Sequence, residues 1–442
     1  MNRIETISQI PHLKKAWEAL KRNKRSYGID EITIADFGSN LDANLIDISK
    51  KLKTGTYKFS PVRGVALPKP GSSKKRPIRV ATISDRVVQK AIEQSIADEL
   101  MKAFDVKNKA SFAYIKDRGL LKAVGHINAL VKDGYEVCLK GDIENYFGEV
   151  NTHKLLNEMI FPALGKDTSL NNLIEESLVQ EVGNIQNLRK MLGSKQAEQI
   201  FPKVPMGIPQ GGILSPLFSN IYLKDLDLTL LDKGFEVVRY ADDFIVLTKT
   251  LDEALEAYEI ALAVTAKLDL KLHPLSERNV IKTRKAKTKT KTYLTLSSDF
   301  EFLGIAFFKG GLYPSVDTFK KMKVRLRELT RKSALDASSL GQKLSSVEQL
   351  TNSWARTYWF TANDNHIKDR YISLNTLLIK TVNSIILSNG LVFKSENLSD
   401  QKKLKRVGLS QFQHRIQSVK AKYLIDKDKV DLVKIFIPEH KL

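Results

Sequence analysis

The stretch RYADDFIVL, residues 239–247, places two adjacent carboxylates, Asp242 and Asp243, between two apolar runs. The runs over 235–239 and 244–247 are typical of short strands, so the aspartates are expected at or near the tip of a β-hairpin. Like charges beside an apolar core repel each other and lose hydration. Either the pair is an ordinary Asp-rich turn, or it binds a divalent cation such as Mg²⁺, which prefers hard oxygen ligands.

A third carboxylate, Asp142, stands at the end of a strand expected over 137–139, in YEVCLKGDIENYF. If that strand pairs with the hairpin, Asp142 and Asp242 face one another. Two metal ions held about 4 Å apart by shared carboxylates stabilise the attacking and leaving oxygens of a phosphoryl transfer. A glycosidase-type carboxylate pair is the alternative, although it does not explain the excess of positive charge described next.

The composition indicates a folded, strongly basic protein. Among 442 residues, 71 Lys and Arg outweigh 50 acidic residues, and the net charge of +21 favours a polyanionic partner, of which nucleic acid is the commonest. A basic protein with no such partner is the plainer alternative. Apolar residues make up 42%, which excludes a disordered or fibrous chain.

Location and covalent chemistry are also constrained by the sequence. No apolar stretch approaches the roughly 20 residues of a membrane span, and the N-terminus lacks the pattern of a secretory signal. We therefore expect no membrane association and a cytoplasmic location. The single cysteine, Cys138, excludes an internal disulfide and a multi-cysteine zinc site, and we expect it to be a buried small residue.

The elements that must position the carboxylates can be predicted in order. Two strands within 65–80 flank a Pro-Gly-Ser-Ser loop, and Ser84 is expected to cap a helix that runs to about 104. A Gly-rich loop then leads into a helix capped by Ser215 that ends at Gly234. The Asp-Asp hairpin, a helix over 251–269, a Gly-Gly hairpin and helices over 316–388 follow. Antiparallel strands with helices, and then helices alone, indicate an α+β unit followed by an all-α unit.

A lysine-rich segment, KTRKAKTKTKT, carries a regular alternation between the helix over 251–269 and the Gly-Gly hairpin. Its alternate lysines would share one face of a strand and form a row suited to a phosphate backbone. The alternative is a solvated loop. The residues concerned are Lys285, Lys287, Lys289 and Lys291.

Several of these segments resemble the motifs of reverse transcriptases. RYADDFIVL resembles the Tyr-x-Asp-Asp box, GDIENYF the first-aspartate motif, and GIPQGGILSPL the Gln-Gly-x-x-x-Ser-Pro loop. Flanking blocks, among them AWEALKRNKRSYGIDEIT, LKTGTYKFSPVRGVALPKPGSSKKRPIRVATISDRVVQKAI, FEFLGIAF and SSVEQLTNSWARTYWF, resemble the bacterial group II intron-like type in order over residues 11–385.

This resemblance implies a right-hand polymerase fold. Fingers and palm with an antiparallel sheet would be followed by an α-helical thumb and a basic C-terminal extension. The implied boundaries are 1–105 for the N-terminal extension and fingers, 106–315 for the palm with the remaining fingers, 316–388 for the thumb, and 389–442 for the extension.

The resemblance also implies roles for the carboxylates. Asp142 and Asp242 correspond to the family's metal ligands, and Asp243 to the adjoining acid of the metal site, whose role as a ligand is less strict. The cofactor implied is a pair of Mg²⁺ ions, with Mn²⁺ as an alternative. Departures from the family pattern, such as Gly148 after Tyr-Phe and Thr152 in place of a histidine, remove no metal ligand. They suggest divergence from mobile introns.

Substrate-binding roles follow in the same way. Phe147 occupies the sugar-gate position, where a bulky ring would clash with a ribose 2′-OH; a core aromatic is the alternative. Lys69 and Arg76 resemble the residues that grip the incoming deoxynucleoside triphosphate (dNTP), a task that suits Lys and Arg. The nearby substitutes in another register are Lys74, Lys75 and Arg79. Gln210 and Gly211 resemble residues that lie under the new base pair, where glycine lets backbone approach closely. For Trp354, Tyr358 and Trp359, core packing is favoured over base stacking.

The function implied is that of an RNA-directed DNA polymerase that uses dNTPs to copy an RNA template into cDNA. We favour a domesticated enzyme of antiphage defence that copies a dedicated, structured non-coding RNA. The alternatives are a group II intron-encoded reverse transcriptase and maturase, and a non-catalytic RNA-binding splicing cofactor. The intact acids at 142, 242 and 243 argue against the last. Priming mode and oligomeric state are left open.

Overall fold

A computed structural model describes most of the chain. The described residues are 3–21, 26–68, 74–165, 167–202, 207–275, 280–281, 293–295, 299–308, 311–331, 339–361, 365–389, 399, 403–405, 407 and 409–425.

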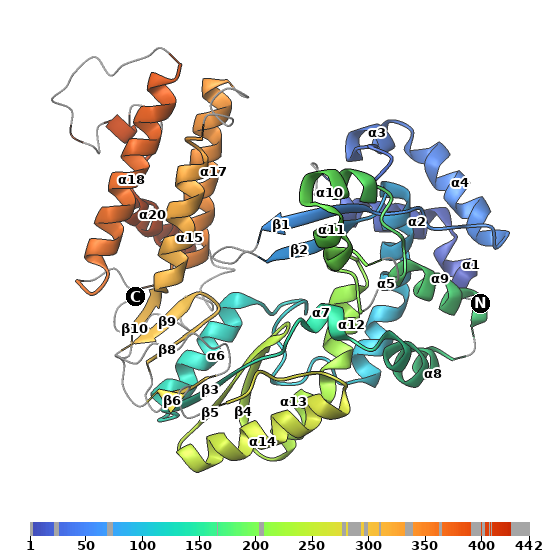
Figure 1. Ribbon diagram of the computed structural model, residues 1–442, viewed down its shortest axis with the longest axis horizontal. Coiled ribbons are helices and arrows are strands. Elements are labelled where there is room, and N and C mark those ends of the chain that lie inside the picture. Colours follow the sequence, from blue (N-terminus) through green and yellow to red (C-terminus); the bar gives the residue numbers. More distant parts are fainter. Residues whose placement is uncertain are drawn as a thin grey trace. The chain divides into compact units, whose positions relative to one another are not determined.

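The chain forms two compact units. The first is drawn from residues within 1–119, 139–280 and 288–294, and the second from residues within 120–138, 281–287 and 295–442. Figure 1 shows the first as helices around a β-hairpin and a sheet, and the second as mainly helical.

Helices of the N-terminal part bury apolar stripes against one another. They are α1 (Arg3–Ile7), α2 (Ile10–Leu20), α3 (Ile34–Ser39), α4 (Leu41–Lys53) and α5 (Ile83–Ala103). On α5 the predicted stripe of Val88, Ile92, Ile96 and Leu100 is fully buried. The predicted cap at Ser84 is wrong. Thr82 keeps an extended backbone and its side chain accepts the Asp85 N–H at 3.1 Å, whereas Ser84 already lies inside the helix.

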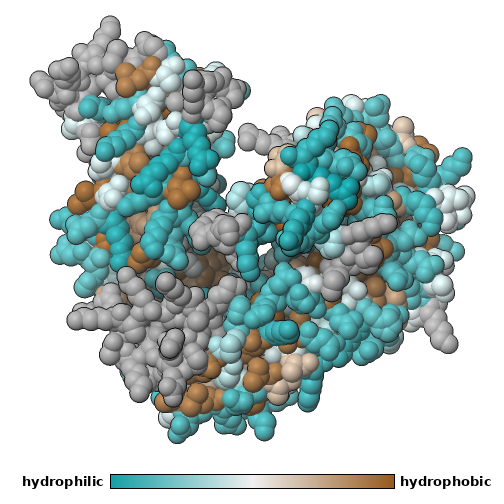
Figure 2. Space-filling view, viewed as in Figure 1, coloured by the Kyte–Doolittle hydropathy of each residue, from teal (hydrophilic) through white to brown (hydrophobic). Residues whose placement is uncertain are grey.

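The predicted pair of strands before α5 is confirmed. Strands β1 (Arg63–Pro68) and β2 (Lys75–Val80) pair antiparallel. Two short helices, α10 (Ile185–Leu192) and α11 (Ser194–Ile200), pack on this hairpin through a small apolar cluster. On the face drawn in Figure 2 the residues over α10 and α11 are mainly hydrophilic, as expected if their apolar side chains turn toward the hairpin.

The central sheet has five strands in the order β4-β5-β3-β7-β6. Strands β4 (Glu236–Tyr240) and β5 (Asp243–Thr248) form the predicted antiparallel hairpin, and β3 (Val137–Asp142) lies beside β5. The other two are β7 (Tyr293–Thr295) and β6 (Val280–Ile281). Because the side chains of β3 and β5 are mostly buried, this sheet is held between packed layers. Cys138 on β3 is buried, as predicted.

Further helices complete the first unit. They are α7 (Tyr146–Glu149), the π-helix η1 (Lys154–Ile160), α8 (Phe161–Leu164), α9 (Thr168–Leu178), α12 (Ser215–Tyr222), α13 (Lys224–Asp232) and α14 (Leu251–Lys267). Gly234 adopts φ +85° just after α13, as predicted for a helix exit. The cap predicted at Ser215 is wrong, because Leu214 precedes the helix and the Ser215 hydroxyl instead donates to the Pro209 carbonyl at 2.7 Å.

The second unit contains α6 (Leu120–Lys132), a three-stranded sheet and a helical bundle. The sheet has the order β10-β9-β8, from β8 (Phe300–Phe302), β9 (Ile305–Phe308) and β10 (Gly311–Pro314). The bundle helices are α15 (Val316–Glu328), α17 (Leu340–Tyr358), α18 (Lys368–Leu387) and α20 (Phe412–Ile425), and they share one apolar core. Trp354 and Trp359 are buried, which confirms core packing.

Within the described ranges, no helix has both the length and the apolar character of a membrane span.

Gly141 of β3 packs directly against the ring of Phe244 on β5, and this contact can be tested. A Cβ on Gly141 would lie 2.1 Å from the Phe244 ring, so Gly141→Ala must push β3 and β5 apart next to Asp142. We expect a loss of about 1–3 kcal/mol in the free energy of unfolding, as for other overpacked cores. Urea denaturation followed by circular dichroism measures it. Gly341→Ala on α17, with open space around it, is the matched control and should leave stability unchanged or raised. Equal stability of the two variants would contradict the tight β3–β5 packing.

Candidate active site

The tip of the β4–β5 hairpin is a two-residue turn. Tyr240 pairs with Asp243, which leaves Ala241 and Asp242 as the loop. Ala241 has φ +61°, a left-handed conformation that disfavours residues with a Cβ other than Asn and Asp. Such a conformation persists only where the surroundings enforce it. The contacts that enforce it here come from the preceding strand.

Arg239 of β4 supplies those contacts from a fully buried position. Its Nε and Nη2 donate to the two carboxylate oxygens of Asp227, on α13, at 2.7 and 2.6 Å. Its Nη1 donates to the Ala241 carbonyl at 3.0 Å. A planar guanidinium held at two points by a carboxylate has a fixed orientation, so it fixes the turn carbonyl that it also binds.

The rest of the Arg239 guanidinium is also satisfied. Nη1 donates to the Asn220 side chain on α12 at 2.9 Å, and Nη2 donates to the Ser111 hydroxyl at 3.0 Å. All five N–H donors of the side chain therefore have partners. Burial lowers the pKa of Arg239, but the charge and hydrogen bonds of Asp227 outweigh it and raise that pKa above its ordinary value. The arginine is therefore a buried, fully paired cation.

Asp142 ends β3 with its side chain 15% exposed. His273 Nε2 lies 3.3 Å from Asp142 Oδ2, and His273 Nδ1 lies 3.1 Å from Glu144 Oε1. The backbones also pair, since His273 N–H donates to the Asp142 carbonyl and Glu144 N–H to the Lys271 carbonyl. The segment 271–273, which follows α14, thus holds Asp142 and Glu144 in place through both backbone and side-chain contacts.

The donor chemistry of this region fits a magnesium ion. Asp142 and Asp243 lie on adjacent strands, with Asp242 next to Asp243 in the turn. Among the described residues, no three His, Cys, Asp or Glu side chains gather as a metal cluster. Mg²⁺ does not need one, because it is commonly held by one or two carboxylates together with substrate phosphates and water.

The segment after Asp142 packs against the Gly-rich loop. Tyr146 is fully buried and donates to the Ser219 carbonyl at 2.7 Å, and burial raises its pKa. Phe147 is half-buried, packs edge-to-face on Tyr146 at 5.5 Å, and its carbonyl accepts the Ile208 N–H at 2.8 Å. Gly207 has φ +68°, and a Cβ there would lie 2.0 Å from the Phe147 carbonyl oxygen. A glycine is therefore required where this loop meets the segment after Asp142.

The same loop reaches β2. The Arg79 N–H donates to the Gln210 carbonyl at 2.9 Å. Gly211 has φ +101°, and a Cβ there would lie 2.9 Å from the Arg79 carbonyl oxygen. The close backbone approach expected at Gly211 is therefore present, and the backbone it approaches is that of β2.

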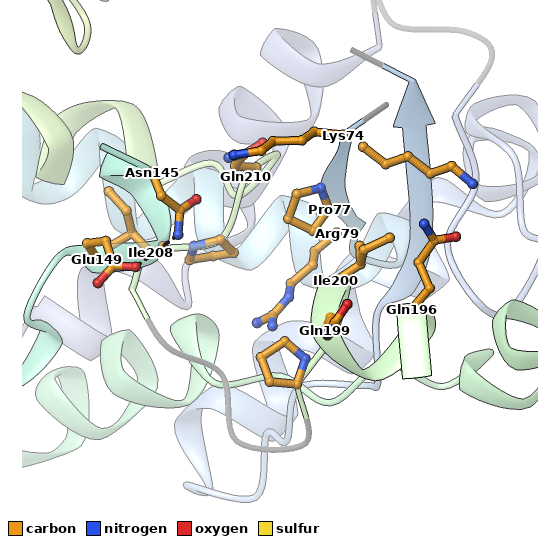
Figure 3. A pocket seen from close by; sticks show the side chains of 14 residues that line it. Lys74, Pro77, Arg79, Asn145, Glu149, Gln196, Gln199, Ile200, Ile208 and Gln210 are labelled. Atoms are coloured by element: carbon orange, nitrogen blue, oxygen red, sulfur yellow. Dashed lines mark hydrogen bonds between the residues drawn. The ribbon is translucent and has the colours of Figure 1, made fainter. Parts of the chain in front are cut away.

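A cavity of about 580 Å³ opens between these elements (Figure 3). Residues of β2 and its approach, the segment after Asp142, α11 and the Gly-rich loop line it. They are Lys74, Lys75, Pro77, Arg79, Asn145, Gly148, Glu149, Gln196, Gln199, Ile200, Pro202, Ile208, Pro209 and Gln210. Its volume falls in the range of small-ligand sites. Cations and amides dominate its polar lining, which suits a phosphorylated ligand.

Strand alternation separates the predicted basic residues. Lys75 and Arg79 face the cavity, whereas Arg76 is exposed, pairs with Leu67 and is not among the lining residues. Lys69 lies outside the described residues. So do Lys285, Lys287, Lys289 and Lys291, and the row of charges stays a prediction.

Comparison with known proteins decides the family. The model of the family described as "Reverse transcriptase (RNA-dependent DNA polymerase)" matches residues 67–307, more than half of the chain. The chain belongs to the reverse transcriptase family. The predicted fold class is thereby confirmed: a right-hand polymerase, α+β in its fingers and palm, with a helical thumb.

Individual relatives indicate the type. Group II intron-encoded protein LtrA of Lactococcus lactis subsp. cremoris is 31% identical over 180 residues, covering 41% of this chain and 27% of LtrA. Protein YkfC of Escherichia coli K12 is 24% identical over 267 residues, covering 52% and 65%. Putative COX1/OXI3 intron 2 protein of Saccharomyces cerevisiae is 28% identical over 236 residues, covering 52% and 25%. The reverse transcriptase is group II intron-like, as predicted, and it spans about a quarter of LtrA's length.

The network around Arg239 was not predicted from the sequence. One signal was available: a charged residue inside an apolar strand, directly before the Asp-Asp turn. Asp227 stands likewise in the apolar helix segment LKDLDLTLL. His273 gave no such signal, because its contacts with Asp142 and Glu144 join segments about 130 residues apart.

The second prediction concerns the buried ion pair between Arg239 and Asp227. Asp227→Ala leaves the Arg239 charge buried and unpaired, so we expect a loss of about 3–5 kcal/mol in the free energy of unfolding. Pairing it with Arg239→Met should destabilise less than the sum of the two single changes, because the partners are coupled. Urea unfolding of the four proteins measures the coupling. Lys51→Ala, which removes an exposed pair with Asp47, is the control and should cost under about 1 kcal/mol. Additive single changes would contradict a coupled buried pair.

Proposed function

We propose that the chain is an RNA-directed DNA polymerase that extends a DNA strand on an RNA template. One observation carries the proposal. A cavity of nucleotide size, lined by Lys74, Lys75 and Arg79, has as its other wall the segment that directly follows Asp142. Cations for phosphate and carboxylates for a metal thus lie on connected elements of one unit, which is the requirement of a nucleotidyl transfer.

The carboxylates take separate roles in this proposal. Asp142 and Asp242 would hold two Mg²⁺ ions, or Mn²⁺ in their place, with Asp243 as the adjoining acid. When bound, such ions neutralise charge on the phosphoryl oxygens and orient the attacking and leaving groups. The Arg239 fork holds the turn that presents Asp242, and the paired segment 271–273 braces Asp142. Preorganised ligands of this kind need little rearrangement during the reaction.

The incoming dNTP would be held by the basic residues before and on β2. Arg79, Lys74 and Lys75 are supported by their place in the cavity wall, and Lys69 and Arg76 by family position alone. Gln210 and Gly211 would support the new base pair. Phe147 would exclude a ribose 2′-OH, as its half-buried position after Asp142 allows.

The biological role that we propose is antiphage defence in the cytoplasm, with a dedicated structured non-coding RNA as template. The net charge of +21 supports a nucleic-acid partner. Relatives named as intron-encoded proteins favour the second candidate, a group II intron reverse transcriptase and maturase. The division into fingers, palm, thumb and basic extension at residues 105, 315 and 388 is part of the same proposal.

The third prediction concerns the carboxylates. Asp142→Ala or Asp242→Ala should abolish DNA synthesis on a primed RNA template, because each removes a ligand whose metal stabilises transition-state charge by several kcal/mol. Asp243→Asn should harm less. Primer extension with labelled dNTPs gives the rate, and circular dichroism checks the fold. Asp232→Ala, at an exposed position at the end of α13, is the control and should retain full activity. Robust DNA synthesis by either alanine variant would contradict the assignment of Asp142 and Asp242 as metal ligands.

The fourth prediction concerns the template. Protein expressed with its native flanking DNA should retain one dominant RNA after a high-salt wash, because charge alone binds any nucleic acid whereas shaped surfaces select one. Sequencing the retained RNA identifies it. A species encoded beside the gene supports the defence role, and a spliced intron supports the maturase. Bulk cellular RNA without an enriched species would defeat both.

A further inference from the structure

The segment that leads into α10 and α11 is hydrogen-bonded to the backbone at the start of the β1–β2 hairpin. The Asn184 side chain accepts the Gly64 N–H at 2.7 Å and donates to the Gly64 carbonyl at 3.0 Å. Beside it, Val62 N–H donates to the Glu181 carbonyl and Gly183 N–H to the Val62 carbonyl. The segment that leads into α10 is therefore tied to the start of β1 as an added strand would be.

A small apolar cluster, called the seam below, also holds these two helices against the hairpin. Leu188 of α10 packs with Ala197 of α11 and with Phe201, all three buried. A Cβ on Gly64 would meet Val182 at 2.7 Å and Leu188 at 2.9 Å, so the helices approach the strand as closely as a glycine allows. These contacts give α11 a defined position along the hairpin.

That position makes α11 one wall of the cavity described above. Gln196 and Gln199 are exposed, lie three residues apart on one face, and line the cavity (Figure 3). Ala197, between them in sequence, is buried in the seam. The wall therefore presents two neutral amides, each of which can donate and accept hydrogen bonds.

Arg79 lines the same cavity from β2. The residue is 8% exposed, and burial lowers the pKa of its guanidinium. Within the described part of the chain, its guanidinium makes no hydrogen bond or ion pair. The guanidinium is open to the cavity, where an anion can reach it and accept charge-assisted hydrogen bonds. One carboxylate, that of Glu149, also lines the cavity, and it accepts a hydrogen bond from the side-chain amide of Asn145 at 3.1 Å.

We propose that this cavity binds one nucleotide unit, with a phosphate on Arg79 and a sugar hydroxyl or base edge on Gln196 and Gln199. The proposal rests on the polymerase function and adds two specificity-determining residues to it. Amides suit this role because they recognise neutral polar groups without repelling a nearby phosphate. The nucleotide unit has two sources, an incoming dNTP or the template RNA strand.

The test is the double variant Gln196→Ala/Gln199→Ala in the full-length chain. Primer extension gives the KM for dNTP, and fluorescence anisotropy gives the Kd for a labelled RNA template. The constant that rises identifies the source of the nucleotide unit. We expect a rise of about tenfold in one of these constants, the effect of losing one or two net hydrogen bonds, with kcat nearly unchanged. Gln186→Ala is the matched control, because Gln186 is exposed on α10 and does not line the cavity. It should change neither constant.

Arg79→Gln provides the second arm. If the unit belongs to the template, the slope of log affinity against log salt should become shallower by about 0.7, the value for one phosphate of a single strand. If it belongs to the dNTP, KM should rise while the RNA salt slope stays constant. Both constants at wild-type values in the double glutamine variant, with the fold intact by circular dichroism, would overturn the proposal.

Failure of the polymerase function is a distinguishable result. A wild-type protein that makes no DNA would refute that function, whereas RNA anisotropy and binding of a fluorescent dNTP still report on the cavity. Loss of binding in the double variant would then support the nucleotide site on its own, and unchanged binding would reject it.

Discussion

The ion pair between Arg239 and Asp227 is the interaction on which the active-site half of the molecule depends. It joins β4 to α13, and through Asn220 and Ser111 it also joins α12 and the segment between α5 and α6. The backbone of Arg239 pairs with Ala110 and Phe112, so that segment adds to the edge of the sheet. One side chain thus fixes four parts of the chain around the Asp-Asp turn.

Such a pair is an expensive way to stabilise a protein, because desolvation of two charges offsets much of their attraction. The contribution of this pair is to hold the backbone of the turn in one conformation. An apolar pair could fill the same volume, but it could not hold the Ala241 carbonyl, and Ala241 needs that contact to remain in a left-handed conformation. The buried charge therefore accounts for a left-handed conformation that the residue type disfavours, at Ala241, directly before the two aspartates that the proposed chemistry requires.

Glycines set the remaining distances in the site. Gly141 lets β3 approach the Phe244 ring, Gly207 lets the Gly-rich loop reach the segment after Asp142, and Gly211 lets it reach β2. The loop consequently bridges the carboxylate side of the cavity and its basic side. A Cβ at Gly207 or Gly211 would push apart surfaces that form the cavity wall, so the shape of the cavity follows from close backbone approach as well as from its polar lining.

Local pattern by itself determined the elements and the family. Two apolar runs on either side of the aspartates gave the Asp-Asp hairpin, the 3.6-residue stripe gave α5, and motifs in order gave the reverse transcriptase family, because each of these signals is carried by neighbouring residues. Tertiary structure alone decided which basic residues face the cavity, the partner of Arg239, the role of His273 beside Asp142, and the wall formed by Gln196 and Gln199. It also moved both predicted helix caps, to Thr82 and Leu214. These features depend on contacts between segments far apart in the chain, and periodicity within one segment carries no information about what another segment places against it.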